Sequence, residues 1–390
     1  MKRVLLLFMV GFLQMQAQQT APGFFFVKTI GPLAFLKYGL GEDRLGGAKQ
    51  GFLDSNILLK VVDSNGISYR VQLSRNHSAW IEKQYTVRIP GKQPAPYHLT
   101  GSMRLRGARP FDTLSISVDE RLPYRTQQQI NPSRIVLDIY GATSNTNWIT
   151  QLQTAKEVKN VYYEQVEDDL LRVYIDLKHA QHWGHTVYYD SLGRLQVLIK
   201  QQPPVLDIKK LRIAIDAGHG GDNLGASGLR SKALEKDYTL KIAKQVQARL
   251  KKAGVYQLFM TRSTDTTLEM PQRIQLLKYY QPDILVSIHL NSAGSDAVRG
   301  TSTYYRYIGF RPLSVAILKQ METLGLKEYG NVGNFNFSLN GPTAYPNCLV
   351  EVAFLSNAED EKRILDPKFH AAVANKIYLG IRDWLAQLNK

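Results

Sequence analysis

The spacing of apolar residues changes character near residue 205. Before this point, short runs rich in β-branched and aromatic residues alternate with turns that contain Gly, Pro and Asn, a pattern typical of all-β domains. After it, compact apolar strands are separated by longer segments with helical periodicity, which indicates an α/β domain. A chain of 390 residues is long enough to bury several cores. The pattern therefore predicts a multidomain protein with a β-rich amino-terminal half.

Two β-type runs, at 57–62 and 68–73, flank a turn that contains Asn-Gly. Such a turn between two β-branched runs predicts a hairpin. We assign residues 24–90 to a small β-barrel-like domain. The turn and the positions of Tyr69 and Trp80 resemble the small bacterial Src-homology-type barrels found beside cell-wall enzymes.

A proline-containing stretch at 90–96 interrupts any strand ladder and marks a domain boundary. Beyond it, two runs at 134–139 and 172–177 each place an Arg four residues before an Asp within an apolar strand. Two copies of one strand type predict a β-sandwich over 97–200. The repeated strand resembles the AMIN-type domain, which localises cell-wall amidases, and an unrelated sandwich is the alternative.

Three histidines, His179, His182 and His185, follow the second of these strands and raise the question of a metal site. No carboxylate or cysteine completes a known ligand spacing around them, and a polar turn beside Trp183 explains them equally well. The only cysteine in the sequence is Cys348, so the chain can form neither an internal disulfide nor a thiolate cluster. Any bound metal must be held by histidines and carboxylates.

Two histidines follow strands of the carboxyl-terminal half. The apolar run at 211–215 is followed by Asp216 and then by His219, which lies between glycines that let the backbone turn sharply. The run at 283–288 ends at His289. Sites in open α/β sheets form beyond the carboxyl ends of strands, so these two side chains are expected to lie near each other.

Two glutamates accompany these histidines. Glu235 begins a segment whose apolar residues recur with the period of a helix, and a carboxylate that complements the helix dipole is the alternative explanation for it. Glu351 lies inside the apolar strand at 348–355, where an unpaired carboxylate is costly to bury. Two His and two Glu suit Zn²⁺, with three protein ligands, an open position for water and one further carboxylate to move protons.

Five blocks follow one another in the domain that we assign to 206–390. They are Asp216-Ala217-Gly218-His219-Gly220-Gly221, Glu235-Lys236, Thr261-Arg262, Ser287-Ile288-His289-Leu290-Asn291 and Leu349-Val350-Glu351-Val352-Ala353-Phe354-Leu355-Ser356-Asn357. In this order they resemble the signature blocks of zinc-dependent N-acetylmuramoyl-L-alanine amidases of the amidase-3 type. The resemblance implies a mixed sheet flanked by helices, Zn²⁺ on His219, Glu235 and His289, and Glu351 as the catalytic base. Asn291 would assist in holding the oxyanion, and Asp216 would support a ligand histidine from behind.

The resemblance also implies the reaction. It is the hydrolysis, by zinc-assisted water attack, of the amide bond between N-acetylmuramic acid and L-alanine in peptidoglycan. A zinc peptidase acting within the stem peptide would use the same ion and base. A non-catalytic wall-binding protein is a further alternative, against which the intact Glu351 argues.

Two positions depart from the family pattern. Asp222-Asn223 stands where the family usually has an Asp-Pro pair, and Asn223 is expected to keep only a loop hydrogen bond. Residues 337–340 stand where many relatives have an Arg, which puts one substrate contact in doubt.

The amino-terminal residues and the charge bear on location. A basic start, an apolar run at 4–13 and the small residue Ala17 predict a signal peptide over 1–17, with an uncleaved anchor as the alternative. The net charge of +16 is spread evenly over both halves, which suits a polyanionic wall, and no motif indicates a nucleic-acid partner. We expect an exported protein of the periplasm or cell envelope that acts on peptidoglycan, without a stable transmembrane anchor. The regulatory protein partner stays unknown.

The interval between His289 and Glu351 bears on regulation. Some relatives insert a helix there that plugs the site. Here a strand at 300–305, a helix at 313–324 and a Gly/Asn/Pro-rich loop at 329–346 account for most of the interval. The spacing therefore predicts an open site, and a loop that folds over the zinc as a lid is the alternative.

Overall fold

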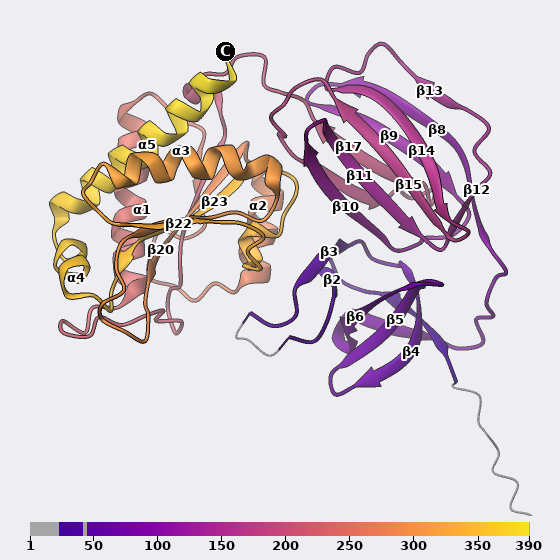
Figure 1. The fold of residues 1–390 in the computed structure, drawn as a ribbon, viewed down its shortest axis with the longest axis horizontal. Helices are drawn as coiled ribbons and strands as arrows, with labels where there is room; N and C mark the ends of the chain where they lie inside the picture. The colour runs from indigo at the N-terminus through magenta and orange to yellow at the C-terminus, as the bar shows by residue number, and fades with distance from the viewer. Residues whose placement is uncertain (1–22, 42–44, 390) are drawn as a thin grey trace, which may run out of the picture.

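The computed structural model describes residues 23–41 and 45–389. Figure 1 shows an α/β unit beside two β-rich units that come earlier in the chain. The signal peptide predicted over 1–17 lies outside the described residues. No helix within the two described ranges is both long and apolar enough to cross a membrane.

The first unit is a seven-stranded antiparallel sheet with the strand order β3-β2-β6-β5-β4-β1-β7. Its strands are β1 (Phe25–Thr29), β2 (Ala34–Lys37), β3 (Lys49–Leu53), β4 (Leu58–Asn65), β5 (Ser68–Ser74), β6 (His77–Glu82) and β7 (Thr86–Ile89), with the 3-10 turn η1 (Lys83–Tyr85) before β7. β4 and β5 form the predicted hairpin, in which Asn65 lies opposite Ser68. Gly66 has a φ of +52°, which explains the glycine at the turn.

The second unit is a sandwich of two sheets. One sheet has the order β10-β11-β15-β14, and the other has the order β12-β8-β9-β17-β16, with β13 paired to β8. The strands are β8 (His98–Ala108), β9 (Phe111–Val118), β10 (Tyr124–Ile130), β11 (Ser133–Tyr140), β12 (Ala142–Ser144), β13 (Ile149–Gln151), β14 (Val158–Glu167), β15 (Leu170–Leu177), β16 (His185–Tyr189) and β17 (Leu195–Lys200).

The two similar strands noted in the sequence, β11 and β15, are antiparallel neighbours. Arg134 lies opposite Asp176, and Asp138 lies opposite Arg172. Both pairs are ion pairs, with N–O distances of 2.8 Å and 2.6 Å. The Arg-to-Asp spacing of four residues therefore reflects cross-strand charge pairing, which is one of the ways in which neighbouring strands stabilise each other.

The two β-rich units share one hydrophobic core. Buried side chains of the first sheet, such as Val27 and Leu59, belong to the same contact cluster as Leu137 and Val173 of the sandwich. The predicted linker at 90–96 lies between β7 and β8. It separates two sheets whose cores are continuous, and the exact domain bounds stay a prediction.

The third unit is a six-stranded sheet with the order β19-β18-β20-β23-β21-β22. Its strands are β18 (Ile213–Ala217), β19 (Leu258–Met260), β20 (Ile284–Asn291), β21 (Thr301–Tyr304), β22 (Glu328–Val332) and β23 (Asn347–Phe354). The pairing of β21 with β23 is antiparallel, while the other pairs are parallel. The predicted fold class, a β-rich half followed by an α/β domain with a mixed sheet, is confirmed.

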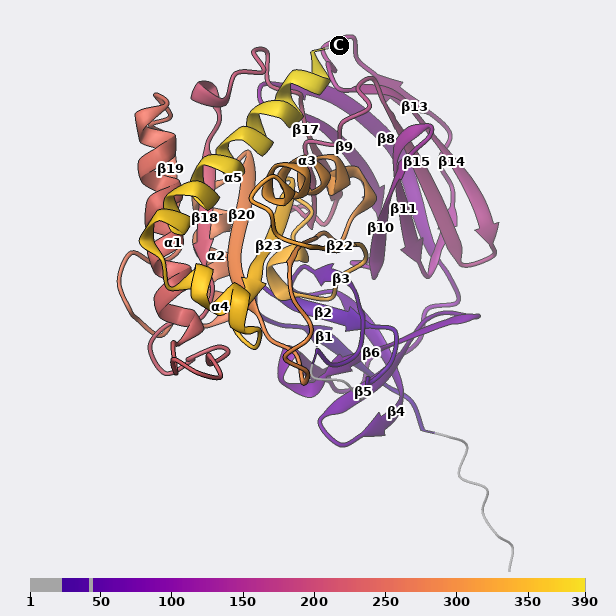
Figure 2. The same ribbon diagram turned by 60° about the vertical axis from the view of Figure 1, so that its left-hand side comes forward.

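Helices cover both faces of this sheet. They are α1 (Glu235–Lys252), α2 (Met270–Tyr280), α3 (Arg311–Glu322), α4 (Ala358–Ile364) and α5 (Pro367–Leu388), with the 3-10 turns η2 (Ile208–Lys210), η3 (Ile308–Phe310) and η4 (Ser338–Asn340). Successive residues of β18 point to opposite faces. Ile213 and Ile215 therefore pack in the cluster under α1, α3 and α5, whereas Ala214 packs with Ile274 of α2. Figure 2 shows the helices beside this sheet.

The side chains of the three sandwich histidines have different hydrogen-bond partners. Each lies 2.8 Å from a different partner: His179 Nδ1 from Glu157 Oε2, His182 Nε2 from Gln129 O, and His185 Nε2 from Thr126 Oγ1. Within the described ranges, the one group of His, Cys, Asp and Glu close enough to hold a metal lies in the α/β unit. These imidazoles form hydrogen bonds in the turn after β15 and at the start of β16, and their role is structural.

Acid is expected to destabilise the sandwich. Burial lowers the pKa of His182 to about 4 and that of His185 to about 3. Both rings stay neutral in the fold but take up a proton on unfolding, so stability falls as the pH drops below about 6.5, by about 1.4 kcal/mol per unit for each ring. Denaturant midpoints at pH 7 and pH 5 measure the loss. His185→Gln should lose less over this range, and an equal loss would contradict the assignment.

Candidate active site

The loop after β18 holds His219 in a constrained backbone conformation. Its φ is +60°, in the left-handed region that residues other than glycine rarely adopt. Its carbonyl accepts a hydrogen bond of 2.5 Å from Arg273 Nη2. Gly218 precedes it because a Cβ at that position would lie 2.4 Å from His289 Cε1. The loop thus brings the two imidazoles together, with ring centroids 5.0 Å apart.

Glu235 joins the two histidines from the first turn of α1. Its Oε1 lies 3.0 Å from His219 Nε2 and 3.1 Å from His289 Nδ1, and it accepts the Leu290 N–H at 3.0 Å. Its Oε2 accepts the Ala226 N–H at 2.8 Å. One possible ligand atom from each of His219, Glu235 and His289 lies within 4.8 Å of the others. The structure therefore places the three predicted ligands in one cluster.

The charges in this cluster stabilise one another. Burial disfavours an ionised Glu235, but hydrogen bonds from His219 and His289 hold the pKa of its carboxyl below the ordinary value. Burial also opposes protonation of His219, yet the hydrogen bond and charge of Glu235 raise the pKa of that ring. A buried carboxylate that stays ionised between two imidazoles is poised to bind a cation.

The donor set fits a zinc ion. His289 is buried, and its Nε2 has no hydrogen-bond partner among the described residues, although buried polar atoms are normally paired. Two imidazoles and one carboxylate match the three-ligand pattern of catalytic zinc sites, which keep a fourth position open. The site therefore has the right chemistry for Zn²⁺.

Glu351 lies beside His289 on the neighbouring strand. The two residues are direct partners in the parallel pairing of β20 with β23, so both side chains leave the sheet on the same face. Ser302 of β21 is its partner on the other side. Glu351 is half-buried and its Oε2 is buried, so the carboxylate lies inside the site beside His289. Its role as the base stays a prediction.

Asp216 lies under the site in a fully buried network. Its carboxylate accepts hydrogen bonds of 2.6 Å from Thr261 Oγ1, Arg273 Nη1 and Ser287 Oγ. Burial disfavours its charge, but Arg273 and the other donors hold its pKa below the ordinary value. The same arginine donates to the His219 carbonyl. Asp216 is thus linked through Arg273 to the backbone of His219, and its predicted support of a ligand histidine stays a prediction.

Asn223 does more than its predicted loop hydrogen bond. Its Oδ1 lies 2.8 Å from His219 Nδ1, while its backbone pairs with Gly220. A partner on one ring nitrogen orients the imidazole and turns the other nitrogen toward the cluster. The short spacing from His219 within a glycine-rich turn is the signal that could have identified this contact.

Two buried arginines donate hydrogen bonds to the loop after β18 that carries His219. The sequence analysis gave neither arginine a role. Arg262 donates to the carbonyls of Ala217 and Gly218 at 2.9 Å and 2.8 Å, and Arg273 donates to the Ala217 carbonyl at 2.7 Å. The Gly218 carbonyl also accepts a hydrogen bond of 2.7 Å from Thr239 Oγ1, so donors surround the carbonyls at the end of β18. A lone arginine next to apolar positions of a helix, as at 273, is the sequence feature that could have indicated a buried arginine of this kind.

Asn291 and the loop at 329–346 lie beside the cluster of His219, Glu235 and His289. Asn291 Nδ2 faces the Tyr304 hydroxyl at 3.5 Å. The loop forms β22 and η4, and its Phe337 ring packs edge-on against His289, with centroids 5.3 Å apart. This loop thus covers one side of His289, and the prediction of an open site stays a prediction.

Two family models match the chain. Residues 213–383 match the family described as N-acetylmuramoyl-L-alanine amidase, and residues 104–197 match the AMIN domain. The chain carries an N-acetylmuramoyl-L-alanine amidase domain. The predicted resemblances of this domain and of the AMIN domain are therefore confirmed.

This part of the chain is similar to individual proteins. Over 194 residues the chain is 29% identical to "Probable cell wall amidase LytH" of Staphylococcus saprophyticus, covering 50% of this chain and 65% of that protein. For LytH of Staphylococcus aureus the values are 32% over 171 residues, 44% and 57%. The chain thus spans about three fifths of the length of these curated relatives. The catalytic domain of CwlV, an amidase from Bacillus (Paenibacillus) polymyxa var. colistinus, is 36% identical, with 45% of this chain and 97% of that chain covered and a TM-score of 0.43.

Proposed function

We propose that this protein hydrolyses the amide bond between N-acetylmuramic acid and L-alanine in peptidoglycan. The observation that carries the proposal is the cluster of His219, Glu235 and His289 with Glu351 beside it, all within the amidase domain. Two imidazoles, a ligand carboxylate and a separate carboxylate for proton transfer are the parts that metal-assisted amide hydrolysis requires.

We assign Zn²⁺ to His219, Glu235 and His289. When bound there, the ion supplies the Lewis acidity that polarises the scissile carbonyl and activates water. The protein contributes the orientation of its ligands. Asn223 fixes the His219 ring, Gly218 lets His289 approach it, and the backbone N–H groups of residues 226 and 290 hold the carboxylate of Glu235.

Glu351 moves the proton. It accepts one proton from the attacking water while the water oxygen bonds to the amide carbon, and it delivers that proton to the L-alanine nitrogen as the C–N bond breaks. The products are a lactyl carboxyl group and a free amine, so the atoms balance. The Asn291 amide, at the same end of β20, would donate to the developing oxyanion.

The remaining properties follow from the domain content and the charge. We propose that the protein is exported to the periplasm or cell envelope, where the AMIN domain and a net charge of +16 hold it on the anionic wall. No nucleic-acid partner is proposed.

Digestion of purified peptidoglycan tests the activity. The full chain without residues 1–17, loaded with Zn²⁺, should release sugar strands without peptides together with intact stem peptides that begin at L-alanine, as identified by mass spectrometry. Shortened stem peptides would instead show a zinc peptidase, and unchanged material would show a wall-binding protein. Either of these results would overturn the proposal.

A further inference from the structure

Residues 333–346, which we call the site strap, connect β22 with β23. The strap carries Phe337 against the ring of His289. It also contacts both β-rich units, which lie more than a hundred residues away in the sequence. The position of one proposed ligand is therefore connected to domains that contain none of the proposed site residues.

The first anchor of the strap is Asn336. Its Oδ1 accepts the Lys49 N–H at 3.1 Å, and its Nδ2 donates to the Gly47 carbonyl at 3.2 Å. Arg306, from the turn after β21, donates to the same Oδ1 at 3.1 Å and also to the Lys49 carbonyl. One asparagine side chain thus joins the amidase domain to the β2–β3 segment of the first unit.

The second anchor is Thr343. The His185 N–H donates to the Thr343 carbonyl at 2.8 Å, and Thr343 Oγ1 donates to the His185 carbonyl at 2.8 Å. The preceding residue of the sandwich is Gly184, where a Cβ would lie 2.2 Å from the Ala344 carbonyl oxygen. Only glycine permits this approach of the two backbones.

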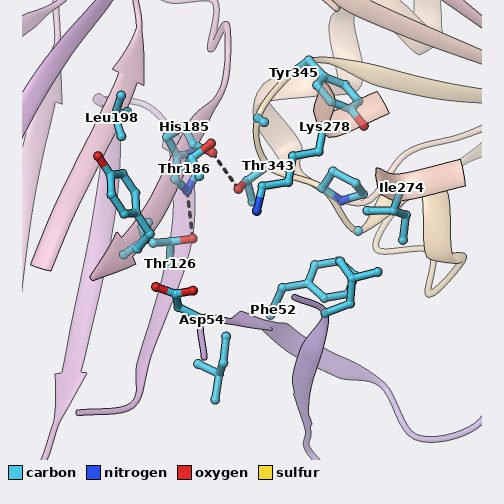
Figure 3. Close-up of a pocket in the computed structure, with 18 of the residues that line it drawn as sticks. Phe52, Asp54, Thr126, His185, Thr186, Leu198, Ile274, Lys278, Thr343 and Tyr345 are labelled. Atoms are coloured by element: carbon cyan, nitrogen blue, oxygen red, sulfur yellow. Dashed lines mark hydrogen bonds between the residues drawn. The ribbon is translucent and has the colours of Figure 1, made fainter. Parts of the chain in front are cut away.

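A cavity of about 610 Å³ lies between the three units, and residues 341–345 of the strap line it. Figure 3 shows it bounded by Phe52 and Asp54 of the first unit, by Thr126 and His185 of the sandwich, and by Ile274, Lys278, Thr343 and Tyr345 of the amidase domain. The strap borders this cavity, and its Leu339 and Tyr345 also pack in a cluster with Ile274 of α2. The two anchors add hydrogen bonds of defined direction to this packing.

We propose that Asn336 is a positioning residue for the active site, through which the β-rich units hold Phe337 against His289. The identity of the reaction rests on the function proposed above, but the effect of Asn336 on the position of Phe337 does not. Loss of the Asn336 anchor lets the start of the strap shift, which moves the Phe337 ring relative to His289 and weakens the ligand set. The amino-terminal units therefore act on the geometry of the site in addition to any role in localisation.

Variants of the full chain test this link. Asn336→Ala removes every side-chain contact of the anchor, whereas Asn336→Asp keeps the acceptor for the Lys49 N–H and for Arg306. Gln153→Ala, at an exposed turn of the sandwich, is the matched control. Hydrogen exchange of the amides at 333–346 should rise about tenfold in Asn336→Ala, since several net hydrogen bonds are lost. Asn336→Asp should lie between it and the wild type, and the control should not differ from the wild type.

Two measurements on the bound metal distinguish an effect of Asn336 on the ligand geometry from a strap that is only more mobile. Chelator competition should show several-fold weaker zinc binding in Asn336→Ala. The visible absorption of Co²⁺-loaded protein, which reports ligand geometry, should shift in Asn336→Ala and likewise in Phe337→Leu. If Asn336→Ala folds poorly, Thr343→Val tests the other anchor by removing its hydroxyl donor, with the same changes expected.

Unchanged strap exchange, zinc binding and Co²⁺ spectrum in folded anchor variants would overturn the positioning role, even if the wild type hydrolyses peptidoglycan. Weaker metal binding with a mobile strap would support it, even if the wild type cuts a different bond. The two proposals can therefore fail separately.

Discussion

Glu351→Gln is expected to reduce peptidoglycan hydrolysis by about 10²–10⁴-fold, the usual contribution of a positioned acid–base group. The amide keeps the size of the side chain on β23 but cannot take a proton from water. Zinc content should stay at the wild-type level, because the three proposed ligands are on other elements. Initial rates of release of dye-labelled peptidoglycan, with elemental analysis of the same sample, measure both effects.

The matched control for this substitution is Glu328→Gln. Glu328 is exposed on β22, at the edge of the same sheet, so the control makes the same chemical change away from the site. It should hydrolyse at the wild-type rate. Near-normal turnover by Glu351→Gln would remove this residue from the mechanism, and loss of its zinc would show that it acts as a ligand instead.

His289→Ala is expected to lower zinc affinity by at least about 100-fold, since even partners behind a ligand contribute 10–100-fold. The substitution also removes one of the imidazoles that hydrogen-bond Glu235, and it leaves that buried carboxylate with a less favourable environment. His219→Ala should have a similar effect. Purified proteins dialysed against a limited zinc buffer and analysed for bound metal provide the measurement.

His98→Ala is the control for the two histidine variants. His98 pairs with Asp119 on the sandwich, far in sequence and in space from the proposed ligands, so its removal should leave zinc content unchanged. Stoichiometric zinc in His289→Ala would show that the ion binds elsewhere or not at all in the proposed cluster. Thermal unfolding with and without Zn²⁺ gives a second readout, because a ligand that binds only the folded state raises its stability.

Local pattern was sufficient for the elements that carry the site. The hairpin around Gly66 follows from its turn chemistry, and the strands that end near His219 and His289 follow from short apolar runs with polar ends. The rule that parallel strands present their carboxyl ends at one edge then predicts that these two side chains meet. The structure brings them together with Glu235, and their roles in binding metal stay predictions.

Contacts between segments that are distant in the chain could not be predicted from local pattern. The sequence predicts that Asp216 supports a ligand histidine, but it does not indicate that Arg273, more than fifty residues later, is the hydrogen-bond partner of Asp216. Likewise the pattern at 329–346 indicates a loop, yet it does not indicate that Phe337 lies on His289 or that Asn336 joins the β2–β3 segment. Periodicity tells which face a residue takes, whereas its partner depends on where other elements pack.

The sequence by itself determined the fold class, the order of the units and the residues expected at the ends of the catalytic strands, because these depend on local spacing of apolar residues, turns and strand ends. Only the tertiary structure decided that the two β-rich units share one core and that both contact the strap whose Phe337 packs against His289. Those features depend on shape complementarity and on hydrogen bonds between segments far apart in the chain, which local pattern does not encode.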